Sequence, residues 1–133
     1  MKKIAVVSLL AIAGTGITAC GDTVVSQQEL SELTVGEFAL KACEAIREVN
    51  YEQLQEMLEV RELEKLNKEI KEQGSESALA AIIEKRLTCE ITNSKVKRDR
   101  DDYTDHEINF SRAEIEIRRE KGTGNFSVTD VDL

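Results

Sequence analysis

Hydrophobic residues recur at helical spacing between residues 34 and 50, and the segment begins with a helix-capping pattern. Thr34 can accept a hydrogen bond from the first turn, and Glu37, three residues later, completes a capping box. The apolar positions that follow lie on one face of a helix. They are Val35, Phe38, Ala39, Ala42, Cys43, Ile46 and Val49. The pattern predicts an amphipathic helix that ends near Asn50.

Further helices are predicted between residues 51 and 87. The apolar stripe of residues 51–58 changes phase before the apolar positions of residues 63–70, which indicates a kink or two short helices. Gly74 favours a helix end. Residues 75–87 then predict a last helix with an inward-facing apolar side. That side comprises Ala78, Leu79, Ile82, Ile83 and Leu87.

After this helix the hydrophobic period changes to that of a strand. Apolar and polar residues alternate from Leu87 to Ile91, which predicts a half-buried strand that continues past Val96. Residues 97–105 are mostly charged and are expected to form a connection to the next strand.

The next strand is expected to contain two apolar pairs on opposite parities, and a bulge near residues 111–113 would keep both pairs on one face. The pairs are Ile108 with Phe110 and Ile115 with Ile117. A turn at residues 122–125 leads to a last strand that starts at Phe126. The order of elements predicts an α+β fold, in which N-terminal helices pack on a curved antiparallel meander of three to four strands.

Residues 1–19 have the pattern of an export signal. Lys2 and Lys3 precede an apolar run at residues 4–13 that contains one serine. The run is too short to cross a bilayer, which needs about 20 apolar residues. A charged start, a short apolar run and small residues are typical of a secretory signal peptide.

The sequence Ile17-Thr18-Ala19-Cys20 resembles the lipobox of bacterial lipoproteins. The resemblance implies that residues 1–19 are removed and that Cys20 carries acyl chains such as palmitate; the alternative is an ordinary signal peptide with a chance cysteine. Each buried methylene contributes about 0.8 kcal/mol, so two or three chains would form a durable membrane anchor. Gly21, in place of aspartate, implies the periplasmic side of the outer membrane if the source has two membranes.

The mature chain is expected to consist of the lipidated cysteine with a tether, residues 20–33, and a single domain, residues 34–133. Loss of Lys2 and Lys3 leaves 16 basic and 26 acidic residues, a net charge of −10. Phosphates would repel such a chain, so we expect no nucleic-acid partner. A basic protein partner is compatible with this charge, although solubility explains the charge equally well.

Two cysteines remain besides Cys20, namely Cys43 and Cys89. Disulfides persist in exported proteins. A bridge between these two residues would stabilise the folded state by about 4 kcal/mol in the chain-entropy model. Two buried free thiols are the alternative.

Residues 34–133 resemble small bacterial lipoproteins of the nuclear-transport-factor-2-like (cystatin-like) superfamily. The resemblance rests on the amphipathic segment Glu37–Leu58, which includes Asn50-Tyr51-Glu52-Gln53-Leu54, and on the C-terminal meander. It implies helices packed on a curved antiparallel sheet. Because this fold hosts enzymes, binding proteins and scaffolds, it does not decide the function.

Candidate chemistry is sparse in the sequence. His106 lies between two acidic residues in a charged segment, which favours a solvated surface histidine over an acid–base catalyst. The segment Asp99–Asp105 fails the pattern of an EF-hand calcium loop, because Thr104 replaces the required glycine. Gly122-Thr123-Gly124 is interpreted as a turn rather than a phosphate loop. We therefore expect no catalytic residue, metal site or cofactor.

These observations favour a non-enzymatic, lipid-anchored envelope protein that binds or scaffolds an unknown ligand, with the membrane as partner through the lipid on Cys20. One alternative is an acidic inhibitor or immunity-type lipoprotein that acts against a basic enzyme. Another is a small-molecule binder or enzyme that uses the concave face of the sheet.

Overall fold

Residues 23–133 are described by the computed structural model, and their first long helix begins at the capping pattern seen in the sequence. Helix α2 spans Val35–Glu48. The Thr34 hydroxyl accepts a hydrogen bond from the Glu37 N–H at 3.1 Å, and the Glu37 carboxylate accepts one from the Thr34 N–H at 2.9 Å. The predicted helix is therefore confirmed. The expected signal peptide, residues 1–19, and Cys20 lie outside the described residues.

The phase shift in the apolar stripe corresponds to two helices, α3 (Tyr51–Met57) and α4 (Val60–Gln73). Leu58 is extended and forms a bridge with Val128, whose carbonyl accepts a hydrogen bond from the Glu59 N–H at 3.0 Å. The chain thus leaves the helix layer to touch the edge of the sheet, which breaks the helix.

Helix α4 ends at Gly74, which has a left-handed φ of 97°. Ser75 caps the next helix, α5 (Glu76–Glu84). Leu79 and Ile83 on α5 are buried as expected. Ile82, also expected to face inward, is 39% exposed.

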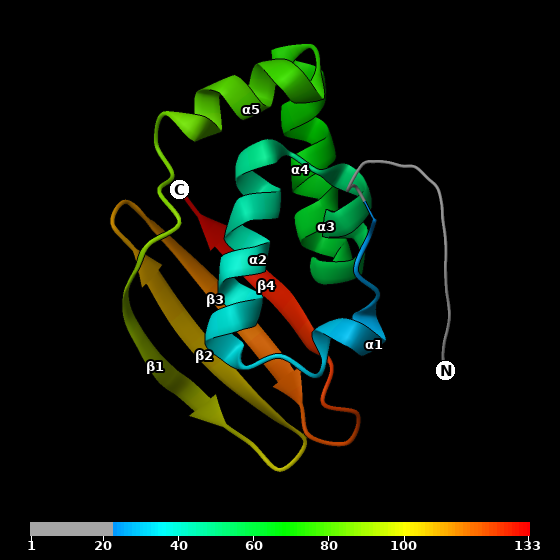
Figure 1. The fold of residues 1–133 in the computed structure, drawn as a ribbon, viewed down its shortest axis with the longest axis vertical. Coiled ribbons are helices and arrows are strands. Elements are labelled where there is room, and N and C mark those ends of the chain that lie inside the picture. The colour runs from blue at the N-terminus through cyan, green and yellow to red at the C-terminus, as the bar shows by residue number, and fades with distance from the viewer. Residues whose placement is uncertain (1–22) are drawn as a thin grey trace.

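Four strands follow the helices and form an open antiparallel sheet in the order β1-β2-β3-β4 (Figure 1). They are β1 (Ile91–Asp99), β2 (Tyr103–Phe110), β3 (Ala113–Glu120) and β4 (Phe126–Asp132). The described part of the chain therefore has the expected α+β class, with helices first and a meander after them.

The boundaries of the first two strands differ from the expectation. Residues 87–90 are not a strand, although Leu87 is fully buried, and β1 begins only at Ile91. The connection expected at residues 97–105 comprises only residues 100–102, because β1 extends to Asp99 and β2 begins at Tyr103 in a hairpin. Charged residues are compatible with these strands because one face of the sheet is open to solvent.

The bulge expected near residues 111–113 is instead a two-residue turn between β2 and β3. Phe110 pairs with Ala113, and Ile108 pairs with Ile115. In this register each even-numbered residue of β2 lies opposite an odd-numbered residue of β3. Partners across a ladder point to the same face, so the hairpin explains the change in parity.

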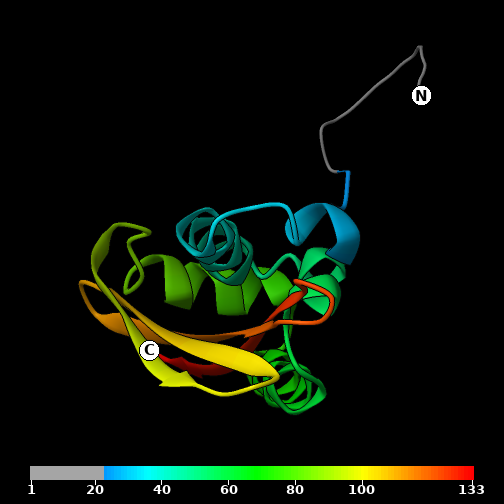
Figure 2. The ribbon, with the colours of Figure 1, turned by 90° about the horizontal axis from the view of Figure 1, so that it is seen from below.

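The core lies between the helices and one face of the sheet. Figure 2 shows α1, α2 and α5 on this face, whereas α4 lies beside β4 and the rest of the opposite face is uncovered. Phe38 of α2 stacks on Phe126 of β4 with 4.8 Å between ring centroids. Ile108, Ile115 and Ile117 are completely buried beneath the helices.

The segment expected to act as a tether packs against the domain from Val25 onward. It contains a short helix, α1 (Gln27–Leu30), whose Leu30 is 1% exposed. The Arg119 guanidinium of β3 donates a hydrogen bond to the Ser31 carbonyl at 2.9 Å. These contacts place the start of the packed domain nearer to residue 25 than to residue 34. Within the described range, no helix has the length and apolar character needed to cross a bilayer.

Candidate functional site

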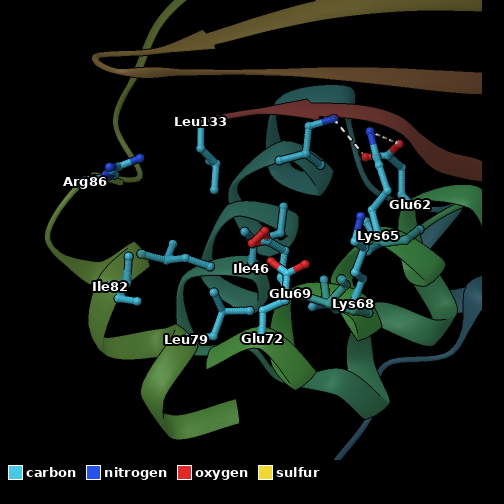
Figure 3. A pocket seen from close by; sticks show the side chains of 15 residues that line it. Ile46, Glu62, Lys65, Lys68, Glu69, Glu72, Leu79, Ile82, Arg86 and Leu133 are labelled. Atoms are coloured by element: carbon cyan, nitrogen blue, oxygen red, sulfur yellow. Dashed lines mark hydrogen bonds and ion pairs between the residues drawn. The ribbon is translucent and has the colours of Figure 1, made fainter. Parts of the chain in front are cut away.

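A groove of about 490 Å³ opens between α4, α5 and the end of β4 (Figure 3). Helices α2 and α3 supply residues to its floor, and nine of its fifteen lining side chains are apolar. These are Ile46, Leu54, Leu58, Leu66, Leu79, Ile82, Ile83, Val131 and Leu133. Ile82 is 39% exposed and Leu133 is 43% exposed, so apolar surface reaches solvent at the groove.

Charged side chains of both signs surround this apolar floor. In Figure 3, Glu69 and Glu72 lie near the middle of the view beside Ile46, with Lys68 on one side and Arg86 on the other. None of the four charged residues forms an ion pair with another residue in the range 23–133. Their charges remain available to a molecule that enters the groove.

Glu62 joins the two walls of the groove. Its carboxylate is almost completely buried and accepts a hydrogen bond from the Val131 N–H of β4 at 3.2 Å. Lys65 Nζ lies 2.9 Å from the other carboxylate oxygen and 3.8 Å from Asp130. The Glu62 carboxylate raises the pKa of Lys65. This arrangement attaches α4 to β4 at one end of the groove.

A second polar centre lies on the uncovered face of the sheet. The Asp105 side chain is 1% exposed and accepts hydrogen bonds from Arg118 at 2.8 and 3.1 Å and from Arg98 at 2.6 Å. The Arg118 guanidinium stacks on Tyr103, 3.7 Å from the ring centroid. Hydrogen bonds from Arg118, and then from Arg98, lower the pKa of Asp105.

Sequence reasoning placed Asp105 in a solvated connection and did not single it out. Its neighbours on β1 and β3, Arg98 and Arg118, are its partners in the sheet register. An Arg–Asp–Arg row across three strands is visible only once that register is known. Because all of the named Asp105 hydrogen bonds are internal, we interpret this centre as structural.

His106 lies within β2 rather than in a connection, paired with Val96 on one side and Ile117 on the other. It is half-buried, not fully solvated as the sequence suggested. Burial lowers the pKa of His106, and the nearby positive charge of Arg119 lowers it further.

The other candidate residues within the described range have structural roles. Cys43 and Cys89 form a disulfide with 5.7 Å between their Cα atoms, which joins α2 to the segment before β1. Asp99 pairs with Lys121 at 2.7 Å. No group of three potential metal ligands occurs within residues 23–133.

The apolar part of the sheet face that could have formed a concave pocket is filled. Ile108, Ile115 and Ile117 are fully buried, and Phe110 is 4% exposed. The open hollow is instead the groove between α4, α5 and the end of β4.

Comparison with known proteins does not assign this chain to a family: no protein-family model, curated protein or solved structure matches it.

Proposed function

We propose that this protein is a lipid-anchored envelope protein whose domain binds an amphiphilic small molecule in the groove between α4, α5 and β4, without catalysing a reaction. The observation that carries the proposal is the groove. Its volume of about 490 Å³ falls within the range of about 300–1,000 Å³ typical of ligand sites.

The lining of the groove defines the chemistry of the ligand. An apolar floor favours a hydrocarbon body, because burial contributes about 25 cal/mol per Å² of apolar surface. A head group that carries both an anion and a cation is favoured by the charges of Lys68, Glu69, Glu72 and Arg86, which form no ion pair within residues 23–133. The proposed ligand is therefore a zwitterionic amphiphile.

Binding can be tested with a fluorescent lysophosphatidylethanolamine, which has a single acyl chain and a zwitterionic head group. Ile82→Asp would place a charge at the mouth of the groove and should abolish saturable binding. Leu40→Asp is the matched control, because Leu40 is 38% exposed on α2 and does not line the groove. Absence of saturable binding, or equal loss in the two variants, would contradict this ligand assignment.

The anchor is supported by the lipobox and is tested separately. The wild-type protein should incorporate radiolabelled palmitate and sediment with membranes, whereas Cys20→Ser should do neither. Unchanged membrane retention of the Cys20→Ser variant would show that the anchor was misinterpreted.

A second candidate function, inhibition of a basic enzyme, is favoured by the distribution of charge. Residues 23–90, which contain all five helices, have fifteen acidic and eight basic side chains. Residues 91–133 have ten acidic and eight basic ones. A basic partner would therefore be attracted mainly to the helical part. In a pull-down from envelope extract, binding that is indifferent to salt would remove this electrostatic argument.

A further inference from the structure

The chain that leads back to Cys20 is fixed to one side of the domain. The Gln53 side chain accepts a hydrogen bond from the Val25 N–H at 2.7 Å and donates one to the Val25 carbonyl at 3.0 Å. Two residues later, the Gln27 N–H donates to the Glu56 carboxylate at 3.1 Å. Residues from Val25 onward are therefore held by α3 and do not act as a free spacer.

The surface at this point is formed by α1 and α3, and we call it the exit surface. It comprises Val25, Gln27, Gln28, Gln53 and Glu56. Only residues 21–24 separate it from Cys20. Five residue steps span at most about 18 Å when fully extended.

This length is short compared with the domain. A chain of this size has a radius of gyration of about 13 Å, so its diameter exceeds the reach of the tether. The described chain begins on the side covered by α1 and α2, and the uncovered face of the sheet lies on the opposite side (Figure 2). A tether of this length prevents the domain from turning over to bring that sheet face to the anchor.

We propose that the exit surface faces the lipid bilayer and that the uncovered face of the sheet points away from it. This orientation rests on the proposed lipid anchor at Cys20. The sheet face with Asp105, Arg98 and Arg118 is then presented to the envelope space rather than to lipid.

The charge of the exit surface determines how it meets the lipid. The exit surface and the segments that carry and flank it, residues 23–40 and helix α3, contain no lysine or arginine. Their acidic residues are Glu29, Glu32, Glu37, Glu52 and Glu56. The Debye length is about 8 Å at physiological salt, so repulsion from anionic lipid acts within the reach of the tether. On anionic lipid the domain should therefore stand further from the bilayer than on neutral lipid, within the reach of the tether.

The test uses acylated full-length protein, purified from membranes and reconstituted into phosphatidylcholine vesicles that contain a head-group nitroxide lipid. Two variants carry one fluorophore each, Gln28→Cys on the exit surface and Asn93→Cys on the outer face of β1. Both positions are exposed neutral amides, and Cys43 and Cys89 are unreactive in their disulfide. The Gln28 label should be quenched several-fold more than the Asn93 label. Added phosphatidylglycerol should reduce the quenching at low salt.

The control lengthens the tether. An insert of about twenty Gly/Ser residues after Asp22 adds a coil that spans about 25 Å, and the difference between the two labels should then diminish. Equal quenching in the protein with the native tether would overturn the orientation while leaving the anchor intact. Failure of the acylated protein to associate with vesicles would overturn the anchor as well, so the two failures are distinguishable.

Discussion

Asp105→Asn should be clearly destabilising although it leaves the size of the side chain almost unchanged. The carboxylate is 1% exposed and holds two guanidinium groups through three hydrogen bonds of 2.6–3.1 Å. Loss of one partner from a buried ion pair costs about 3–5 kcal/mol. Since the Arg98 and Arg118 side chains are 39% and 33% exposed, solvent offsets part of that cost. We expect a loss of about 2–3 kcal/mol in the free energy of unfolding at neutral pH.

The measurement is urea-induced unfolding followed by circular dichroism. Asp99→Asn is the matched control, because Asp99 also accepts from a basic side chain, Lys121, but is 66% exposed. It should change the unfolding midpoint far less than Asp105→Asn. An Asp105→Asn protein within about 0.5 kcal/mol of the wild type, the usual range for surface substitutions, would refute the reasoning.

The pH dependence provides a second test. The pKa of Asp105 in the folded state lies below its ordinary value of 3.8, so the unfolded chain binds the proton more readily. Its stabilising contribution is therefore fully present above pH of about 4 and declines as the pH falls through the folded-state pKa. The stability difference between wild type and Asp105→Asn should stay constant at neutral pH and shrink in acid. A difference that is the same at pH of about 3 as at pH 7 would contradict an ionised Asp105.

Three further predictions concern the framework. Replacement of Cys43 and Cys89 by alanine removes a bridge across a sequence separation of 46 residues and should lower the free energy of unfolding in urea by about 4 kcal/mol. If the wild-type protein has the same gel mobility with and without a reducing agent, the bridge is absent. Gly74→Ala should lower the unfolding free energy by about 1 kcal/mol, because an alanine would have to adopt the left-handed φ of 97° at the helix end. No neighbouring atom lies within 4 Å of the added Cβ, so a steric clash does not contribute. An unchanged thermal midpoint would contradict this backbone strain. Gln53→Ala should accelerate amide hydrogen exchange at Val25. Gln53→Glu, which keeps an acceptor for that N–H, should accelerate it less. Equal exchange in Gln53→Ala and the wild type would show that the contact does not hold the segment.

Helices were predictable where the signal is local. The capping box of Thr34 and Glu37 acts within one turn, and the left-handed end at Gly74 depends on one residue. The disulfide of Cys43 and Cys89 was one of two alternatives, because the sequence indicates export but not the distance between the thiols. The α+β order also followed from the change in hydrophobic period.

The β2–β3 hairpin could not be distinguished from a bulge. Its turn residues, Ser111 and Arg112, lack the Asn-Gly or Asp-Gly pattern that marks two-residue hairpins. A bulge and a hairpin produce the same change in parity along the chain. Only the pairing of Ile108 with Ile115 decides between them.

The sequence by itself determined the capped helices, the change from helices to strands and the acidic charge, because caps, hydrophobic period and composition act over a few residues. Only the tertiary structure decided the groove, the buried Asp105 and the attachment of the N-terminal segment. Gln53 is 28 residues from Val25, and Arg119 is 88 residues from Ser31. These contacts join segments that are far apart in the sequence, and packing of the helices on one another and on the sheet brings them together, so they leave no pattern in neighbouring residues.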